Sequence, residues 1–210
     1  MKAVNIHSLA VAWTEVLNRR TNREGVELQK MILGIEILLH NIPKMVLLVV
    51  VAWFLGILPQ ALITFLPFAV IRGYASGLHA NNAITCTIVT LLMFVAAPYA
   101  LQGVYISAAL LLIVFALVGI GMFMYAPADT AARPILGRKK RARLKKKAVL
   151  STGVMLAAAL ALGIGFDNPA LYSLFAVGAV YALIMILPLT YKLLGKSMNN
   201  YAGYEQGLAG

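Results

Sequence analysis

The stretch from Arg72 to Cys86 reads Arg-Gly-Tyr-Ala-Ser-Gly-Leu-His-Ala-Asn-Asn-Ala-Ile-Thr-Cys and interrupts an otherwise apolar sequence. It holds the only cysteine, one of three histidines, and the only Lys, Arg, Asp or Glu between Lys44 and Asp129. Polar groups are costly inside a membrane, and those kept there usually serve a function. The sequence therefore predicts that any chemistry of this protein takes place in this stretch.

Cys86 and His79 are the residue types of a thiolate nucleophile and its general base, provided that their side chains meet. On one continuous helix their seven-residue separation is about 10 Å along the axis, too far for contact, so the helix must break between them. Asn81 or Asn82 can cap a new helix with Cys86 in its first turn and His79 just outside the same end. A helix N-terminus and a nearby imidazolium stabilise a thiolate, and free N–H groups there can bind an oxyanion. Without this context, a lone cysteine is more often a small buried apolar residue than a nucleophile.

Composition places the whole chain in one integral membrane unit. Of its 210 residues, 61% are hydrophobic and 12% are charged, with a mean hydropathy of +0.86. A single cysteine excludes a disulfide framework within the chain and a multi-cysteine metal site. The sequence has no P-loop, zinc-protease or serine-hydrolase motif. We therefore expect a reaction that needs neither a metal nor another cofactor.

The placement of the charges argues against a nucleic-acid partner, although the net charge is +11. Of the 18 Lys and Arg residues, nine lie between Arg133 and Lys147 and six lie at or before Lys44. This is the asymmetry of a membrane protein whose basic loops stay in the cytoplasm. The sequence therefore predicts a cytoplasmic N-terminus, with the Arg72–Cys86 break, the basic loop and the C-terminus on the same side.

The predicted fold is an all-α integral membrane protein with about six transmembrane helices, preceded by N-terminal amphipathic helices. Thr21 and Glu24 have capping-box spacing, which predicts a helix from there to about Asn41. The apolar runs predict spans at 43–58, 60–71, 82–100, 104–125, 148–166 and 170–191. We divide the chain into an amphipathic region (1–41), four spans (42–125) with the catalytic segment 72–86, a basic loop (126–147), two spans (148–191) and a cytoplasmic tail (192–210).

The second predicted span is only about 12 residues, or roughly 18 Å, which is too short for a hydrocarbon core of about 30 Å. The Cys86 site is therefore expected to be recessed below the headgroups. Tyr74, Ser76 and Thr85 are expected to line its cavity.

Glu36 lies on the apolar face of its predicted helix and needs a partner. It can pair with His40 or Arg72, or it can orient His79 as the third member of a triad. Asn81 or a backbone carbonyl can supply the same hydrogen-bond acceptor. All of these alternatives remain open from the sequence.

Arg72 also has two interpretations. Its side chain can extend to the membrane interface, or it can position a substrate backbone or the site itself. Gly73 and Gly77 have the spacing of a helix-dimerisation motif, but their place beside Ser76 favours a role in the turn.

These residues resemble the accessory gene regulator B family of quorum-sensing peptide processors. The resemblance rests on Arg72, Gly77, His79, Ala80 and Cys86 in a polytopic membrane setting. Two further stretches support it, Leu33-Gly34-Ile35-Glu36-Ile37-Leu38 with Asn41-Ile42 and Lys44, and Tyr125-Ala126-Pro127-Ala128-Asp129-Thr130 with Arg133-Pro134. Together they cover most of the chain.

The resemblance implies a single peptidase domain over residues 1–210 of a bacterial plasma membrane, with its site facing the cytoplasm. The implied substrate is a short pro-peptide with an amphipathic leader, a central signal segment and a charged C-terminal tail. Cys86 would cleave off the tail through an acyl-thioester, with His79 as general base and acid. A precursor Cys or Ser side chain would then close a thiolactone or lactone ring. The resemblance also implies a homodimer.

The basic loop can bind anionic lipid headgroups of the cytoplasmic leaflet, or it can dock the acidic tail that the resembled family is thought to recognise. Both can hold, and Asp129 near Arg133 can fix the start of the loop. The docking candidates are Arg138, Lys139, Lys140, Arg141, Arg143, Lys145, Lys146 and Lys147.

Two other function classes fit the same residues. A peptide exporter or permease would place His79, Arg72 and Glu36 along a translocation path and leave Cys86 passive. An inert scaffold would recruit partners through the basic loop. Covalent trapping of Cys86 by a peptide would separate a peptidase from both.

Overall fold

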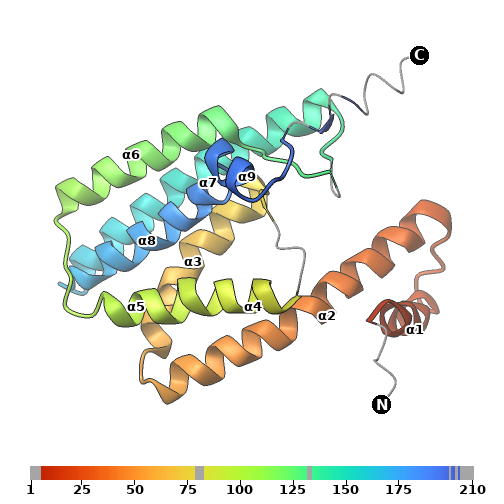
Figure 1. Cartoon of the computed structure of the whole chain (residues 1–210), viewed down its shortest axis with the longest axis horizontal. Helices are drawn as coiled ribbons and strands as arrows, with labels where there is room; N and C mark the ends of the chain where they lie inside the picture. Colours follow the sequence, from red (N-terminus) through yellow and green to blue (C-terminus); the bar gives the residue numbers. More distant parts are fainter. Residues whose placement is uncertain (1–5, 79–82, 132–133, 199, 202, 204–210) are drawn as a thin grey trace.

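The computed structural model describes residues 6–78, 83–131, 134–198, 200, 201 and 203. Every regular element in these ranges is a helix, which confirms the predicted all-α fold. The elements are α1 (Ile6–Asn18), α2 (Gly25–Phe54), α3 (Leu58–Ala75), α4 (Ala83–Leu91), a π-helical segment (Leu92–Ala96), α5 (Ala97–Ala100), α6 (Ala108–Tyr125), α7 (Arg138–Gly165), α8 (Ala170–Ile184) and α9 (Pro188–Leu193) (Figure 1).

Within the described residues, the four helices α2, α3, α6 and α7 are long and apolar enough to cross a membrane. Two shorter apolar stretches, Ile84–Ala100 and Ala170–Ile184, take the places of the two other predicted spans. The six apolar runs of the sequence thus correspond to six apolar helical stretches.

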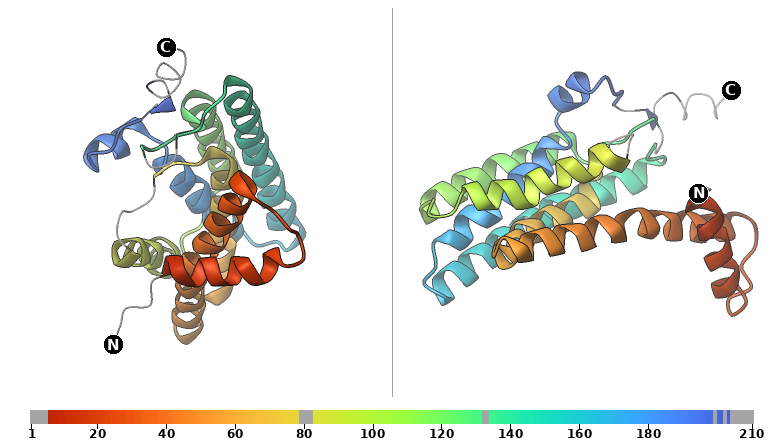
Figure 2. Two further views of the ribbon diagram at one scale, coloured as in Figure 1. Left: turned by 90° about the vertical axis from the view of Figure 1, so that its right-hand side faces the viewer. Right: turned by 60° about the horizontal axis from the view of Figure 1, so that its bottom comes forward.

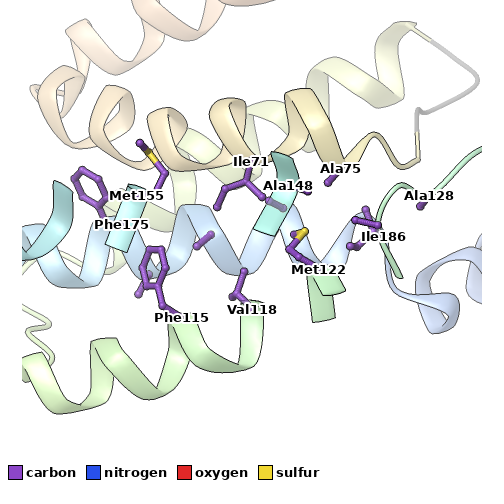
Figure 3. Close-up of a cluster of buried hydrophobic side chains, with 14 of the residues drawn as sticks. Ile71, Ala75, Phe115, Val118, Met122, Ala128, Ala148, Met155, Phe175 and Ile186 are labelled. Carbon is purple, nitrogen blue, oxygen red and sulfur yellow. The ribbon is translucent and has the colours of Figure 1, made fainter. Parts of the chain in front are cut away.

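Helices α3, α6, α7 and α8 pack into one bundle. Its buried core contains side chains from all four helices (Figure 3). They include Ile71, Ala75, Phe115, Val118, Met122, Ala148, Met155 and Phe175. The closest approach of α3 and α8 is at Gly178, where a Cβ atom would lie 2.1 Å from the backbone oxygen of Thr64. Only glycine allows the two helices to pack at this distance.

A second buried cluster attaches α2 and the π-helical segment to the bundle. It joins the end of α2, the start of α3 and the π-helical segment through Leu48, Ala52, Ile57, Ala61, Phe94 and Val95. The ring of Phe94 meets Phe65 edge-on at 5.2 Å and Tyr181 of α8 at 5.9 Å. These contacts hold the helical stretch Ala83–Ala100 alongside the bundle.

The N-terminal part of the chain differs from the prediction. Helix α2 runs for 30 residues through Pro43 instead of ending near Asn41. A proline inside a helix leaves the carbonyl four residues before it, here that of Leu39, without its helical donor, and such prolines are tolerated in apolar helices. The first half of α2 extends, with α1 packed on it, beyond the bundle (Figures 1 and 2).

The predicted capping box is also wrong, because α2 begins at Gly25, after Glu24. The Thr21 hydroxyl donates to the side chain of Asn18 at 3.0 Å, and the same Asn18 oxygen accepts the Arg23 N–H at 2.7 Å. Asn18 thereby closes the turn after α1.

Three predicted boundaries further along the chain are corrected. The second span is the 18-residue helix α3, about 27 Å long, with proline in its first turn. The basic residues from Arg138 to Lys147 form the first turns of α7 and not a loop, because Lys and Arg favour helices and no Gly or Pro interrupts them. The last span breaks after Ile184, and α9 follows as a separate short helix.

Candidate functional site

The backbone after α3 is hydrogen-bonded to two segments that are distant in sequence. The Ala128 N–H donates to Ala75 O at 3.0 Å, and the Gly77 N–H donates to Ala128 O at 2.9 Å. The Leu78 N–H donates to Met185 O at the end of α8, at 3.1 Å. The chain leading to His79 is therefore fixed by the segment after α6 and by the end of α8.

Gly77 is required by this geometry. Its φ of +108° lies outside the range that L side chains favour, and a Cβ atom would lie 2.6 Å from Met185 O. Gly73, in contrast, is helical, and a Cβ atom there would meet nothing within 4 Å. The predicted role in the turn is confirmed for Gly77 and is wrong for Gly73. Ser76 also has a positive φ, of 59°, and forms a bridge with Ala128.

These two glycines give a matched pair for a prediction. Gly77→Ala should lower the midpoint of thermal unfolding, because the new methyl group clashes with a backbone oxygen and strains φ, at a cost of about 1–3 kcal/mol. Gly73→Ala should leave the midpoint unchanged or raise it slightly, because alanine favours a helix by about 1 kcal/mol over glycine. Equal midpoints for the two purified variants would contradict the assigned role of Gly77.

Arg72, in the last turn of α3, connects the turn to the rest of the site. Its Nη2 donates to the carbonyl of Leu78, the residue before His79. Its guanidinium carbon lies 5.5 Å from the centre of the Phe68 ring, and the group interacts electrostatically with the Cys86 thiol and with Tyr191. Arg72 Nη1 is buried without a hydrogen-bond partner among the described residues. Arg72 is thus held against the turn by its contacts within the molecule.

Cys86 is the fourth residue of α4, so the thiol lies in the first turn of a helix, as predicted. The residue is half-buried, and its carbonyl accepts the Thr90 hydroxyl at 2.7 Å. His79 and Asn81 lie outside the described residues, as does Asn82, which directly precedes α4 in the sequence.

The predicted enclosed cavity is not formed by its expected residues. Tyr74 and Thr85 are exposed, and only Ser76 is half-buried. The recessed position of the site was predicted from a short second span, and this reason no longer holds because α3 is longer. A cavity of about 300 Å³ lies instead near the opposite end of the bundle. Its walls are largely apolar and include Leu101, Ile106, Val114 and Tyr181.

Among the described residues Glu36 pairs with neither His40 nor Arg72, and His79, its third predicted partner, lies outside them. Oε1 of Glu36 lies 3.8 Å from Nδ1 of His7, so the ion pair that the structure shows joins α2 to α1. The side chain of Glu36 is 28% exposed, which fits a position on the projecting half of α2. This pair supports a structural role between the two N-terminal helices.

The basic start of α7 lies beside the site. Lys147 Nζ is 5.3 Å from the centre of the Tyr74 ring in the last turn of α3, and Lys145 Nζ is 4.5 Å from that of Phe123 in α6. Arg141 differs from the other residues predicted to dock an acidic tail. Its guanidinium already stacks on Tyr201 at 3.7 Å and donates to Ile135 O at 3.2 Å.

Asp129 is a functional candidate whose contacts the sequence did not reveal. Its side chain is buried, and its carboxylate accepts hydrogen bonds from Asn200 and Tyr201. These partners are about 70 residues away in the chain. The one signal was an acidic residue in a run of apolar and small residues, with Arg133 as its nearest basic residue in the sequence.

Comparisons with known proteins identify the family of the chain. The model of the accessory gene regulator B family matches residues 10–188. An AgrB-like protein of Clostridium acetobutylicum is 35% identical over 98% of this chain and 96% of its own length. An AgrB-like protein of Listeria monocytogenes is 38% identical over 82% of each chain.

A more distant relative, the accessory gene regulator protein B of Staphylococcus aureus, is 28% identical over 83% of this chain and 90% of its own length. No solved structure matches the chain. The family model spans α1 to the start of α9 and includes the whole Arg72–Cys86 stretch. The chain therefore belongs to the accessory gene regulator B family.

Proposed function

We propose that this protein is a membrane-embedded cysteine endopeptidase of a quorum-sensing system, with Cys86 as its nucleophile and His79 as its general base. The substrate class is a small pro-peptide with an amphipathic leader, a signal segment and a charged C-terminal tail. Membership of the accessory gene regulator B family supports the quorum-sensing role. The geometry around Cys86 supports the chemistry.

The observation that carries the proposal is the position of Arg72 relative to the turn before His79 and to Cys86. Arg72 binds the Leu78 carbonyl, and its positive charge would attract a thiolate at Cys86. Leu78 and Ala83 are five positions apart, so the chain between them spans at most about 18 Å. His79 lies in this connection, outside the described residues, and is the general base that we propose for Cys86.

The proposed reaction has two stages. His79 takes the proton from Cys86, and the thiolate attacks the carbonyl that joins the signal segment to the tail. His79 then protonates the departing amine, which releases the tail and leaves an acyl-thioester on Cys86. A Cys or Ser side chain of the signal segment attacks this thioester, forms a thiolactone or lactone, and returns the thiol to Cys86.

Arg72 has a second part in this mechanism. Its buried Nη1 atom lacks a partner among the described residues, and a buried donor without a partner gains most from a new acceptor. We assign Nη1 to a backbone carbonyl of the bound precursor. Nη2 meanwhile keeps its bond to Leu78 and so fixes the turn before His79.

The basic start of α7 would bind the acidic tail of the precursor. Lys147 lies at the ring of Tyr74, at the end of α3 nearest to the Arg72 turn. A tail held there would place the bond to be cut between the basic residues and Cys86. The same charges would bind anionic lipid headgroups on the cytoplasmic side, where we place the site. We further propose that residues 1–210 act as one peptidase domain and as a homodimer.

The test is a covalent intermediate. Purified enzyme, incubated with its precursor peptide and quenched in acid, should gain the mass of the leader plus signal segment on the peptide that contains Cys86. A precursor whose signal Cys or Ser is replaced by Ala should increase this adduct, because the ring cannot close. Transport of intact precursor into proteoliposomes without any adduct would instead favour an exporter.

A further inference from the structure

The carboxylate of Asp129 is a buried anchor for the C-terminal part of the chain. Asp129 is 3% exposed. Its Oδ1 accepts the backbone N–H and the side-chain Nδ2 of Asn200 at 3.0 and 3.2 Å, and its Oδ2 accepts the Tyr201 N–H at 3.0 Å. Hydrogen bonds to a charged acceptor are about twice as strong as neutral ones.

A second contact strengthens the same attachment. The guanidinium of Arg141, in the first turn of α7, stacks on the ring of Tyr201 at 3.7 Å. The loop after α6 and the start of α7 therefore hold the same two residues from two sides. We call this group of Asp129, Arg141, Asn200 and Tyr201 the tail clasp.

The tail clasp is one residue from the turn that leads to the site. Ala128, directly before Asp129, exchanges backbone hydrogen bonds with Ala75 and Gly77.

We propose that Asp129 and Tyr201 are positioning residues for the Cys86 site. By holding the segment after α6 in place, the tail clasp keeps Ala128 paired with Gly77 and so fixes the turn that carries His79. This proposal rests on the function proposed above, because it assigns the clasp a role in the geometry of the same site. Tyr201 belongs to neither buried core cluster, so its removal should act on the turn and not on the bundle.

The first measurement is amide hydrogen exchange on the full-length protein in detergent. Tyr201→Ala removes the ring from Arg141 and should speed exchange of the Gly77 and Ala128 amides about tenfold, while α6 amides such as Val118 stay unchanged. Tyr201→Phe keeps the ring and the backbone N–H and should behave as wild type. Asp129→Asn, which replaces one acceptor oxygen by a donor, should give the same pattern as Tyr201→Ala or a stronger one.

The second measurement is the rate at which iodoacetamide alkylates Cys86 at pH 7. Because Cys86 is the only cysteine, the rate reports this thiol alone, and it depends on the fraction present as thiolate. A loosened turn should lower the rate about tenfold in Tyr201→Ala and not in Tyr201→Phe. His79→Ala should lower the wild-type rate by a similar factor.

The outcomes separate the two proposals. Unchanged exchange at Gly77 and Ala128 in Tyr201→Ala would overturn the positioning role, whatever the alkylation rate. If His79→Ala slows alkylation, a second result would also overturn the positioning role. That result is faster amide exchange in Tyr201→Ala together with an unchanged or increased rate of Cys86 alkylation. A wild-type rate equal to that of His79→Ala would contradict the proposed His79/Cys86 pair, and the exchange data would then show only whether the clasp holds the turn.

Discussion

Replacement of Cys86 by alanine is expected to abolish cleavage of the precursor peptide while the protein still inserts into the membrane and elutes as a single species. The substitution removes the nucleophile, and no other cysteine can take its place. It also removes little packing, because Cys86 is half-buried. The measurement is the cleavage rate per mole of monodisperse enzyme, with the precursor resolved by mass spectrometry.

His79→Ala should reduce the same rate by about 10²–10⁴-fold, the usual contribution of a general acid–base group. Thr85→Ala is the matched control, since Thr85 is exposed in the same turn of α4 as Cys86. It should cleave at the wild-type rate. Residual cleavage by Cys86→Ala above the background of an empty membrane preparation would remove Cys86 from the mechanism.

Arg72→Met is expected to lower precursor cleavage at least tenfold. Methionine keeps an apolar stem against Phe68 but leaves the Leu78 carbonyl without its donor. An unpaired buried carbonyl costs about 1–3 kcal/mol, and about 1.4 kcal/mol corresponds to a factor of ten. The turn before His79 should therefore lose its fixed position.

Arg72→Lys distinguishes geometry from charge. Lysine keeps the positive charge but lacks the planar guanidinium. In arginine, one guanidinium nitrogen binds the Leu78 carbonyl and the other is left for a substrate carbonyl. Arg72→Lys should therefore be nearly as slow as Arg72→Met. Arg20→Met, an exposed change of the same kind between α1 and α2, should have the wild-type rate. Wild-type activity of Arg72→Lys would show that a positive charge suffices.

The features predicted from sequence were those with a local physical cause. The apolar runs determined the helices, and the break after Arg72 placed Cys86 in the first turn of α4. Gly77 could be assigned to the turn because glycine is the residue that such a backbone needs. Each of these inferences depends only on residues within one or two turns of the feature itself.

The incorrect predictions concern residues whose structure is decided by a contact partner that the sequence does not specify. Pro43 is a helix breaker in isolation, yet α2 continues through it. The Thr21 hydroxyl donates to Asn18 in the turn after α1, and α2 begins only at Gly25. Asp129 binds Asn200 and Glu36 lies near His7, and neither pairing has a signature in spacing or periodicity. The expectation that His79 and Cys86 meet stays a prediction.

The uninterrupted course of α2 makes the protein sensitive to bilayer thickness. A helix of 30 residues is about 45 Å long, whereas the hydrocarbon core is about 30 Å thick. The Arg23–Glu27–Lys30 ion pairs at the start of α2 favour water. If α2 stands upright, α1 is held well clear of the acyl chains, and if α2 tilts to reduce hydrophobic mismatch, α1 comes down toward the headgroups. Lipid composition would thus set how the amphipathic leader of the proposed substrate, lying flat in the interface, meets α1.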